Sequence, residues 1–126
     1  MVVEGLLYTK DHEWAKVEGD IVTMGIADYA QEQLGELVFV ELPEVGREIA
    51  ARKEIAVVES SKAAGDVYSP VTGTVTEVNS ELTTKPELVN EDCYEGGWIC
   101  KLKITDKTSL DNLMDAQKYQ EYLDTL

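Results

Sequence analysis

Apolar and polar residues alternate along much of the chain, and this period of two residues predicts β-strands. The pattern is plainest in residues 98–104, where two lysines alternate with apolar side chains. Glu13–Glu18 and Ile21–Ile26 are predicted to pair as a hairpin, because Gly19-Asp20 between them is a turn sequence. Five further segments are predicted to be strands, namely residues 36–42, 48–49, 54–60, 66–69 and 73–78.

Three segments break this pattern and predict helices. Residues 29–34 form a predicted short helix with Asp28 as its N-cap and Gly35 just past its end, so the helix lies near 28–34. A turn of helix is predicted around residues 86–89. Apolar residues then recur at helical spacing, which predicts C-terminal helices near 109–125, the second of them capped by Asp115.

Short strands joined by regular turns, with few helices, predict a mainly-β fold. We expect an antiparallel β-sandwich or flattened barrel. The chain has 126 residues and no low-complexity segment divides it, so residues 1–126 are predicted to form a single domain.

The charge of the chain narrows the range of partners. Its formal net charge of -14 argues against nucleic-acid binding, because neutralising phosphates requires clustered Lys and Arg. An acidic surface suits docking onto basic patches of partner proteins, although a solvated surface with no steering role fits equally well. No apolar run approaches the roughly 18–20 residues that span a bilayer, and no signal-peptide pattern is visible, so we expect no membrane association.

No constellation of catalytic residues is apparent. His12 beside Glu13 is a candidate general base, but a lone histidine next to a carboxylate more often packs or hydrogen-bonds. Phosphate-binding loops, nucleophile elbows and metal-ligand spacings are absent from the sequence. Cys93 and Cys100 are too few for a disulfide framework and are expected to be buried thiols. Any chemistry is therefore expected to come from a group attached to the protein.

Lys62 is the residue best placed to carry such a group. It is predicted to lie at the tip of a hairpin between two strands, with Ser61 beside it. Its neighbours on both sides are small, namely Ser60, Ser61, Ala63, Ala64 and Gly65. Small neighbours leave the amine accessible to another protein. Turn chemistry alone would also fit an ordinary surface lysine.

The residues around Lys62 resemble a known signature. ESSKAAGDVYSP, residues 59–70, is similar to the lipoyl-lysine pattern Glu-Ser-x-Lys-Ala-x-x-Asp-x-x-Ser-Pro of the glycine cleavage system H-protein family. The likeness extends over residues 7–123, and its strongest segments are YTKDHEW, GIADYAQEQLGELVFVELPEVG and GGWICKLKI. The resemblance implies a lipoyl/biotinyl-type hybrid β-sandwich and lipoic acid attached through an amide to Lys62.

The resemblance also implies a non-catalytic role among several enzymes. The lipoyl group would move the aminomethyl group of glycine from a PLP-dependent glycine decarboxylase to a tetrahydrofolate-dependent aminomethyltransferase. An FAD-dependent dihydrolipoamide dehydrogenase would reoxidise it, and a lipoate-attaching enzyme would install it. We expect a monomer in the cytoplasm, or in the mitochondrial matrix if the source is a eukaryote.

The family implies, in addition, a surface cleft that holds the loaded arm. The matching residues are Glu13 and Asp66, with Asp11 and Gln33 beside them. Ionised carboxylates within hydrogen-bond reach suit a protonated amine. Alternatively, Glu13 and Asp66 simply cap turns. Gln33 departs from relatives that carry histidine at this position.

Other roles for the same lysine are conceivable. A lipoate-relay protein would donate the lipoyl group to 2-oxoacid dehydrogenase subunits. Biotinyl domains present Met-Lys-Met, whereas Lys62 lies between Ser61 and Ala63. Lipoyl domains of dehydrogenase complexes usually have Asp-Lys-Ala and a linker to a larger chain, and neither is seen here. A purely structural β-domain is the last alternative.

Overall fold

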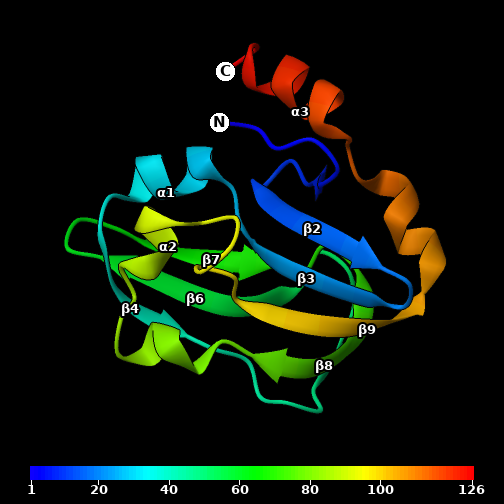
Figure 1. The fold of residues 1–126 in the computed structure, drawn as a ribbon, viewed down its shortest axis with the longest axis horizontal. Coiled ribbons are helices and arrows are strands. Elements are labelled where there is room, and N and C mark those ends of the chain that lie inside the picture. Colours follow the sequence, from blue (N-terminus) through cyan, green and yellow to red (C-terminus); the bar gives the residue numbers. More distant parts are fainter.

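Two antiparallel β-sheets face each other in the computed structural model, which describes residues 1–126 (Figure 1). The larger sheet has six strands in the order β1-β2-β3-β9-β8-β5. Their bounds are Leu7–Tyr8 for β1, Glu13–Glu18 for β2, Ile21–Ile26 for β3, Glu48–Ile49 for β5, Thr72–Val78 for β8 and Cys100–Asp106 for β9.

The smaller sheet has three strands in the order β4-β6-β7. These strands are β4 (Leu37–Glu41), β6 (Glu54–Ser60) and β7 (Ala64–Tyr68). Buried apolar side chains from both sheets meet in one core, for example Val22 and Leu102 from the larger sheet and Val58 from the smaller one. The predicted sandwich is therefore confirmed, and its two sheets stay separate rather than closing into a barrel.

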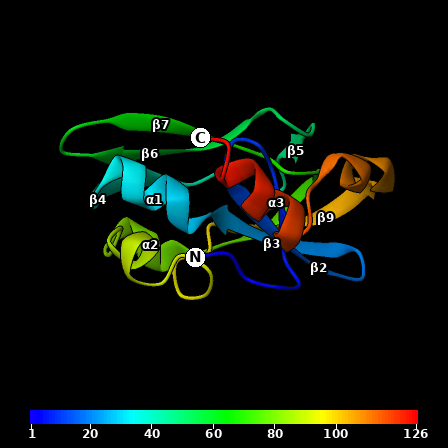
Figure 2. The same ribbon diagram turned by 90° about the horizontal axis from the view of Figure 1, so that it is seen from above.

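The helices are short and lie outside the two sheets (Figure 2). Their bounds are α1 (Asp28–Leu34), α2 (Leu88–Glu91) and α3 (Ala116–Leu123), with two 3-10 helices, η1 (Ser80–Thr83) and η2 (Lys107–Asn112). Helix α3 packs on the N-terminal segment, where the rings of Tyr119 and Tyr8 stack with centroids 4.3 Å apart. The helical pattern of the C-terminal residues is confirmed, and the Asp115 carboxylate caps α3 by accepting from the Lys118 amide at 2.8 Å.

The predicted N-cap of α1 is wrong. Ala27, not Asp28, precedes the helix, and no side chain caps it. Ala27 is held in extended backbone because its amide donates to the carbonyl of His12 at 2.8 Å, so the helix begins one residue later. The Asp28 carboxylate instead accepts hydrogen bonds from the side-chain amide of Gln31 and from the amino group of Met1. Gly35 ends the helix as predicted, with φ of 83°.

Most predicted strands have their expected bounds to within two residues. The last strand, β9, is shifted by two residues at both ends, because residues 98–99 lie outside it, and β1 (Leu7–Tyr8) was not predicted. Both cysteines are free and buried, as predicted, and burial raises the pKa of each thiol to about 12.

Candidate functional site

Lys62 lies at the tip of the hairpin formed by β6 and β7. Cα pairing runs to Glu59 and Ala64, and the Ser60 amide donates to the Ala63 carbonyl at 2.8 Å. Ser61 and Lys62 are the two central residues of the turn, as the sequence predicted, and both are exposed.

The Ser60 side chain fixes the shape of this turn. Its hydroxyl accepts from the Lys62 amide at 3.3 Å and from the Ala63 amide at 3.1 Å, and it lies 3.2 Å from the Ala63 carbonyl. The hydroxyl thus takes the place of a backbone carbonyl in closing the turn. The small residue before the tip therefore sets where the lysine side chain begins.

The stem of Lys62 lies across the backbone of Gly35. A Cβ atom at Gly35 would lie 2.7 Å from Lys62 Cε, so a side chain at this position would require the end of the exposed lysine to move aside. Asn90 on α2 holds this backbone in place, because its amide group donates to the Gly35 carbonyl at 2.8 Å and accepts from the Leu37 amide at 2.9 Å. The ammonium group takes part in none of the four ion pairs of the structure.

Glu13 is a buried carboxyl group with well-defined partners. Only 2% of its surface is exposed. The Thr9 hydroxyl donates to Oε1 at 2.5 Å, and the Tyr68 amide donates to Oε2 at 3.1 Å. Burial raises the pKa of Glu13 to about 7, and these two hydrogen bonds only partly oppose that effect. Near neutral pH, Glu13 therefore exchanges readily between its neutral and ionised forms.

Three exposed carboxylates, those of Asp66, Asp11 and Glu54, act on the side chain of Tyr68, and Asp11 also raises the pKa of Glu13. The negative charge of Asp66 is the main reason why the pKa of Tyr68 is raised, followed by burial and then by Asp11, Glu54 and Glu13. Asp66 is likewise the main cause of the raised pKa of Glu54. An ammonium ion placed among these carboxylates would relieve their mutual repulsion.

Strand β7 connects Lys62 with these carboxylates. It starts just after Lys62, carries Asp66, and ends at Tyr68, whose amide contacts Glu13. At about 3.3 Å per residue, the strand places Asp66 about 13 Å and Tyr68 about 20 Å along the chain from Lys62. A long flexible group on Lys62 that folds back along β7 would pass these carboxylates.

Three of the residues predicted for the cleft, Asp66, Asp11 and Glu13, all raise the pKa of Tyr68. Gln33 is exposed on α1 and makes no hydrogen bond to any of them. Asp11 is paired with Arg52, its carboxylate 3.1 Å from the guanidinium, and each side chain is a little under half exposed.

Comparison with known proteins decides the family. A model of the family described as glycine cleavage H-protein matches residues 6–126. The chain belongs to this family. It is 55% identical over 123 residues to the glycine cleavage system H protein of Thermoanaerobacter pseudethanolicus, covering 98% of this chain and 97% of that one. It is 56% identical over 119 residues to the H protein of Parvibaculum lavamentivorans, covering 94% and 95% of the two chains.

A solved structure of the glycine cleavage H-protein family shares the whole fold. The crystal structure of the H protein from Mycobacterium marinum matches with a TM-score of 0.89 at 34% sequence identity, over 99% of this chain and 100% of that one. The family predicted from the lysine motif and the fold predicted from the strand pattern are both confirmed.

In this member of the H-protein family, His12 has a packing role. Its Nδ1 lies 2.7 Å from the Tyr119 hydroxyl, and its ring lies 4.4 Å from that of Tyr29, centroid to centroid. Burial lowers its pKa, which favours the neutral ring. The backbone at His12 is left-handed, with φ of 70°, and it turns the chain so that the next residue, Glu13, points inward.

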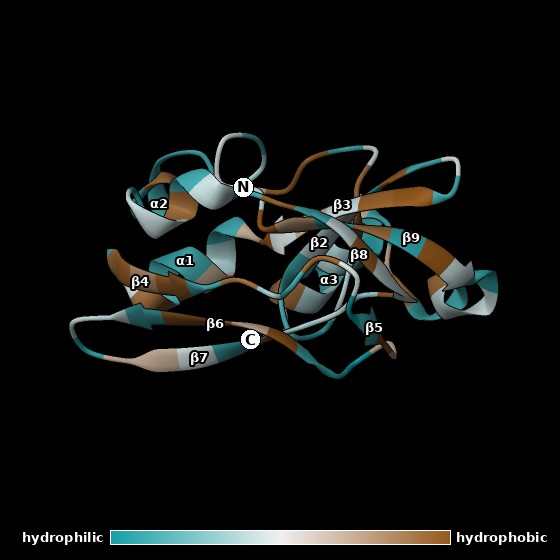
Figure 3. Cartoon of the chain, turned by 90° about the horizontal axis from the view of Figure 1, so that it is seen from below, coloured by the Kyte–Doolittle hydropathy of each residue, from teal (hydrophilic) through white to brown (hydrophobic).

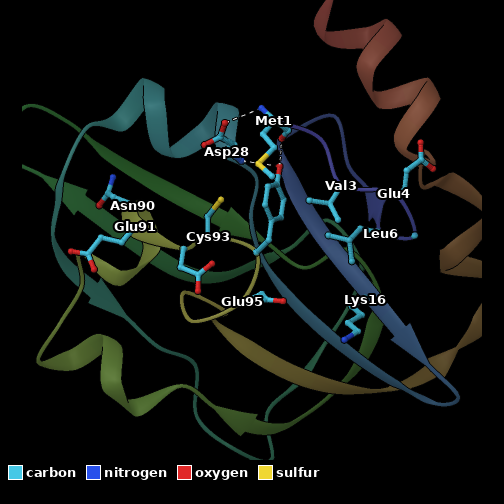
Figure 4. A pocket seen from close by; sticks show the side chains of 13 residues that line it. Met1, Val3, Glu4, Leu6, Lys16, Asp28, Asn90, Glu91, Cys93 and Glu95 are labelled. Atoms are coloured by element: carbon cyan, nitrogen blue, oxygen red, sulfur yellow. Dashed lines mark hydrogen bonds and ion pairs between the residues drawn. The ribbon is translucent and has the colours of Figure 1, made fainter.

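A cavity in this H-protein fold is not lined by Lys62 or Glu13 (Figure 4). It has a volume of about 580 Å³ and is lined by N-terminal residues and by the segment that follows α2. Its polar groups already bind one another, since Asp28 accepts from the Met1 amino group at 2.9 Å and Tyr94 donates to the Met1 carbonyl at 2.6 Å. No group of side chains could hold a metal ion, and no helix is long and apolar enough to cross a bilayer.

Several residues that build this H-protein site were missed from the sequence. Thr9 has a signal, because a hydroxyl four residues before a buried carboxyl can reach it across a turn. Tyr68 contributes a backbone amide and Gly35 a bare Cα, and neither leaves a chemical signature in a sequence. Arg52 has left-handed backbone with φ of 73°, which no local pattern predicts for arginine.

Proposed function

We propose that this chain is the lipoyl-carrying shuttle of the glycine cleavage system and that Lys62 is the residue to which lipoic acid is attached. The observation that carries the proposal is an exposed lysine at a two-residue hairpin tip, in a chain that belongs to the H-protein family. The turn held by Ser60 gives the arm a fixed origin, while the arm itself stays free.

Lys62 fits the attached group chemically. Amide formation removes the positive charge of its ammonium group, which has no ion-pair partner to lose. When bound, the lipoyl group supplies a disulfide that accepts the aminomethyl group of glycine and is later regenerated. Tethering raises the local concentration of this group at each partner enzyme. The chain needs no turnover of its own.

The carboxylates beside β7 are proposed to hold the lipoyl arm when it carries the aminomethyl group. Glu13, Asp66 and Asp11 would surround the protonated amine, and Gln33 stays a predicted outer contact. A cation beside Glu13 favours the ionised carboxyl, so we expect loading to lower the pKa of Glu13 from about 7. Holding the amine out of bulk water would limit its hydrolysis to ammonia and formaldehyde.

The proposed partners are a PLP-dependent glycine decarboxylase, a tetrahydrofolate-dependent aminomethyltransferase, an FAD-dependent dihydrolipoamide dehydrogenase and a lipoate-attaching enzyme. Membership of the H-protein family supports a role among the enzymes of one system. We further infer that the chain acts as a monomer in the cytoplasm, and its similarity to bacterial relatives supports that location.

Glycine–bicarbonate exchange with a glycine decarboxylase tests the carrier role. We expect exchange with the lipoylated chain, none with Lys62→Arg, and unchanged exchange with Lys85→Arg, a control at another exposed lysine. Efficient transfer of the lipoyl group to a 2-oxoacid dehydrogenase subunit, without glycine exchange, would favour the lipoate relay and contradict the proposal.

A further inference from the structure

Two large apolar side chains are exposed on β4. Val38 has 59% of its surface exposed and Phe39 has 49%, while Leu37 before them and Val40 after them are buried. A regular strand would bury every second residue. The two consecutive exposed residues therefore mark a break in the strand.

A β-bulge causes this break. Leu37 pairs with Ser60 of β6, but Phe39 pairs with Glu59, so β4 advances two residues where β6 advances one. Bulges re-aim side chains and are typical of strand edges near functional sites. Without the bulge, one of the two apolar residues would point into the core.

The exposed pair lies beside Lys62. Phe39 pairs with Glu59, three residues before the lysine, and Leu37, the neighbour of Val38, pairs with Ser60, two residues before it. Gly35, which supports the lysine stem, comes two residues before β4. The brown apolar section of β4 lies next to the β6–β7 hairpin in Figure 3, at the same end of the molecule.

Acidic residues border the apolar pair. Glu36, Glu41 and Glu59 are all exposed, and none of them takes part in an ion pair. Strand β4 is also the edge of its sheet, with β6 on one side only. An exposed apolar edge is normally avoided unless another protein covers it. The complementary surface is apolar at its centre and basic at its rim.

We propose that Val38 and Phe39 form the docking surface for the enzyme that attaches the lipoyl group to Lys62, and that this enzyme presents an apolar surface bordered by Lys and Arg. The inference rests on the proposed function. The choice of enzyme follows from distance, because the amine of an unmodified lysine lies only one side-chain length from the hairpin backbone. An enzyme acting on that amine must contact the residues around the hairpin, whereas enzymes acting at the end of the lipoyl arm work farther away.

The step at Lys62 is an acyl transfer from an activated lipoyl group such as an acyl adenylate. The Nζ lone pair attacks the acyl carbon, forming the amide bond. The bond from that carbon to the phosphate oxygen breaks, the adenylate leaves with the electron pair, and the neutral amine nitrogen releases one proton to solvent and keeps the other as the amide hydrogen. Docking at Val38 and Phe39 contributes to binding and leaves this chemistry unchanged.

The test measures the rate of lipoylation against the concentration of unmodified acceptor, by intact mass, with a lipoate-attaching enzyme. The test variant is Val38→Thr/Phe39→Ser, and the control is Val45→Ser, an apolar residue 61% exposed in the turn between β4 and β5. We expect the KM of the test variant to rise about tenfold, a loss of about 1.4 kcal/mol in binding, with kcat within twofold of the unsubstituted chain. The control should match the unsubstituted chain in both constants.

Two further variants guard against a loss of fold. Phe39→Leu keeps an apolar side chain and should retain at least half of kcat/KM, whereas Phe39→Gln alone should show a smaller rise in KM than the double variant. Equal kcat/KM for the test variant and the unsubstituted chain would overturn the inference. So would an unchanged lipoylation rate combined with a loss in glycine exchange, which would assign the surface to a later enzyme.

Sedimentation of the same variants tests whether a second copy of this chain, rather than an enzyme, covers Val38 and Phe39. If the unsubstituted chain self-associates through β4 and the Phe39 variants do not, the surface is an interface between copies and the inference is wrong. An unsubstituted chain that accepts no lipoyl group at all would instead contradict the proposed function, and this inference with it.

Discussion

Glu13 shows how much one buried group can influence the molecule. Its carboxyl is almost completely buried, and two neutral donors, Thr9 and the Tyr68 amide, contact its oxygens. Neutral donors do not fully compensate for the loss of water around a charge. The pKa of Glu13 rises from 4.5 to about 7 as a result, so the folded chain binds a proton more tightly than the unfolded chain.

The proton on Glu13 makes stability depend on pH. Because the folded pKa is raised, the stabilisation from this group is complete below pH 4.5 and is lost as pH rises from 4.5 to about 7. The loss is about 3 kcal/mol for a shift of this size. Glu13→Gln keeps the shape and removes the charge, so we expect it to be more stable than the unsubstituted chain above pH 7, by about 1–3 kcal/mol. Urea unfolding at several pH values measures the difference.

Below pH 4.5 the two proteins should have similar stability, because Glu13 is neutral in both states. Gln33→Glu is a suitable comparison, since it changes charge at an exposed position. A Glu13→Gln variant with the same pH profile as the unsubstituted chain would show that folding leaves the pKa of Glu13 unchanged.

Ser60 is predicted to fix the origin of the arm. Ser60→Ala removes the acceptor of the Lys62 and Ala63 amides. We expect a loss of about 0.5–1.5 kcal/mol in the free energy of unfolding and faster hydrogen exchange at those two amides. Ser61→Ala is the matched control, because the Ser61 hydroxyl makes no hydrogen bond and the variant should leave exchange unchanged. Equal exchange rates in both variants would mean that the backbone alone holds the turn.

At the scale of elements, the strands were the most predictable part of the molecule. β2, β3 and β6 have the predicted bounds because their apolar residues alternate or cluster between clear turns. The N-cap of α1 was not predictable, because a backbone hydrogen bond from Ala27 to His12 decides it. The bulge in β4 was also missed, since ELVFVEL reads as an ordinary strand in isolation.

The candidate site divides in the same way. Lys62, Glu13, Asp66 and Asp11 were predicted from the family resemblance and their roles stay predictions, while the structure shows that the charges of the three carboxylates all raise the pKa of Tyr68. The supporting contacts were not found, because they depend on backbone amides and on close approaches between distant elements. Gln33 remains a prediction without a contact to the other three.

Gly35 ends helix α1, and its backbone lies against the side chain of Lys62. Gly35→Ala places a Cβ in left-handed backbone and within 2.7 Å of Lys62 Cε, so we expect it to destabilise the fold and displace the lysine stem. Gly46→Ala is the matched control, because it has φ of 95° and a Cβ there would meet nothing within 4 Å. Both should lose about 1–2 kcal/mol from backbone strain.

Only Gly35→Ala should change the NMR shifts of the Lys62 side chain. Identical Lys62 shifts in the two variants would show that the lysine does not rest on Gly35.

At the scale of the whole molecule, a net charge of -14 is expected to steer partners. Long-range attraction is screened over about 10 Å at 0.1 M salt. We therefore expect the KM for this chain in glycine exchange to rise about tenfold between 20 and 300 mM salt. Free lipoamide as the acceptor provides the control, because it carries no such charge. A KM independent of salt would mean that the acidic surface has no steering role.

The central claim is that Lys62 carries the lipoyl group, and peptide mass spectrometry tests it most directly. The chain is produced together with a lipoate-attaching enzyme, digested, and examined for modification at every lysine. The account predicts one lipoyl group per chain on Lys62, and none on a Lys62→Arg variant that unfolds at nearly the same temperature, because the side chain is exposed. An unmodified Lys62 under these conditions, or a lipoyl group on another lysine, would contradict it.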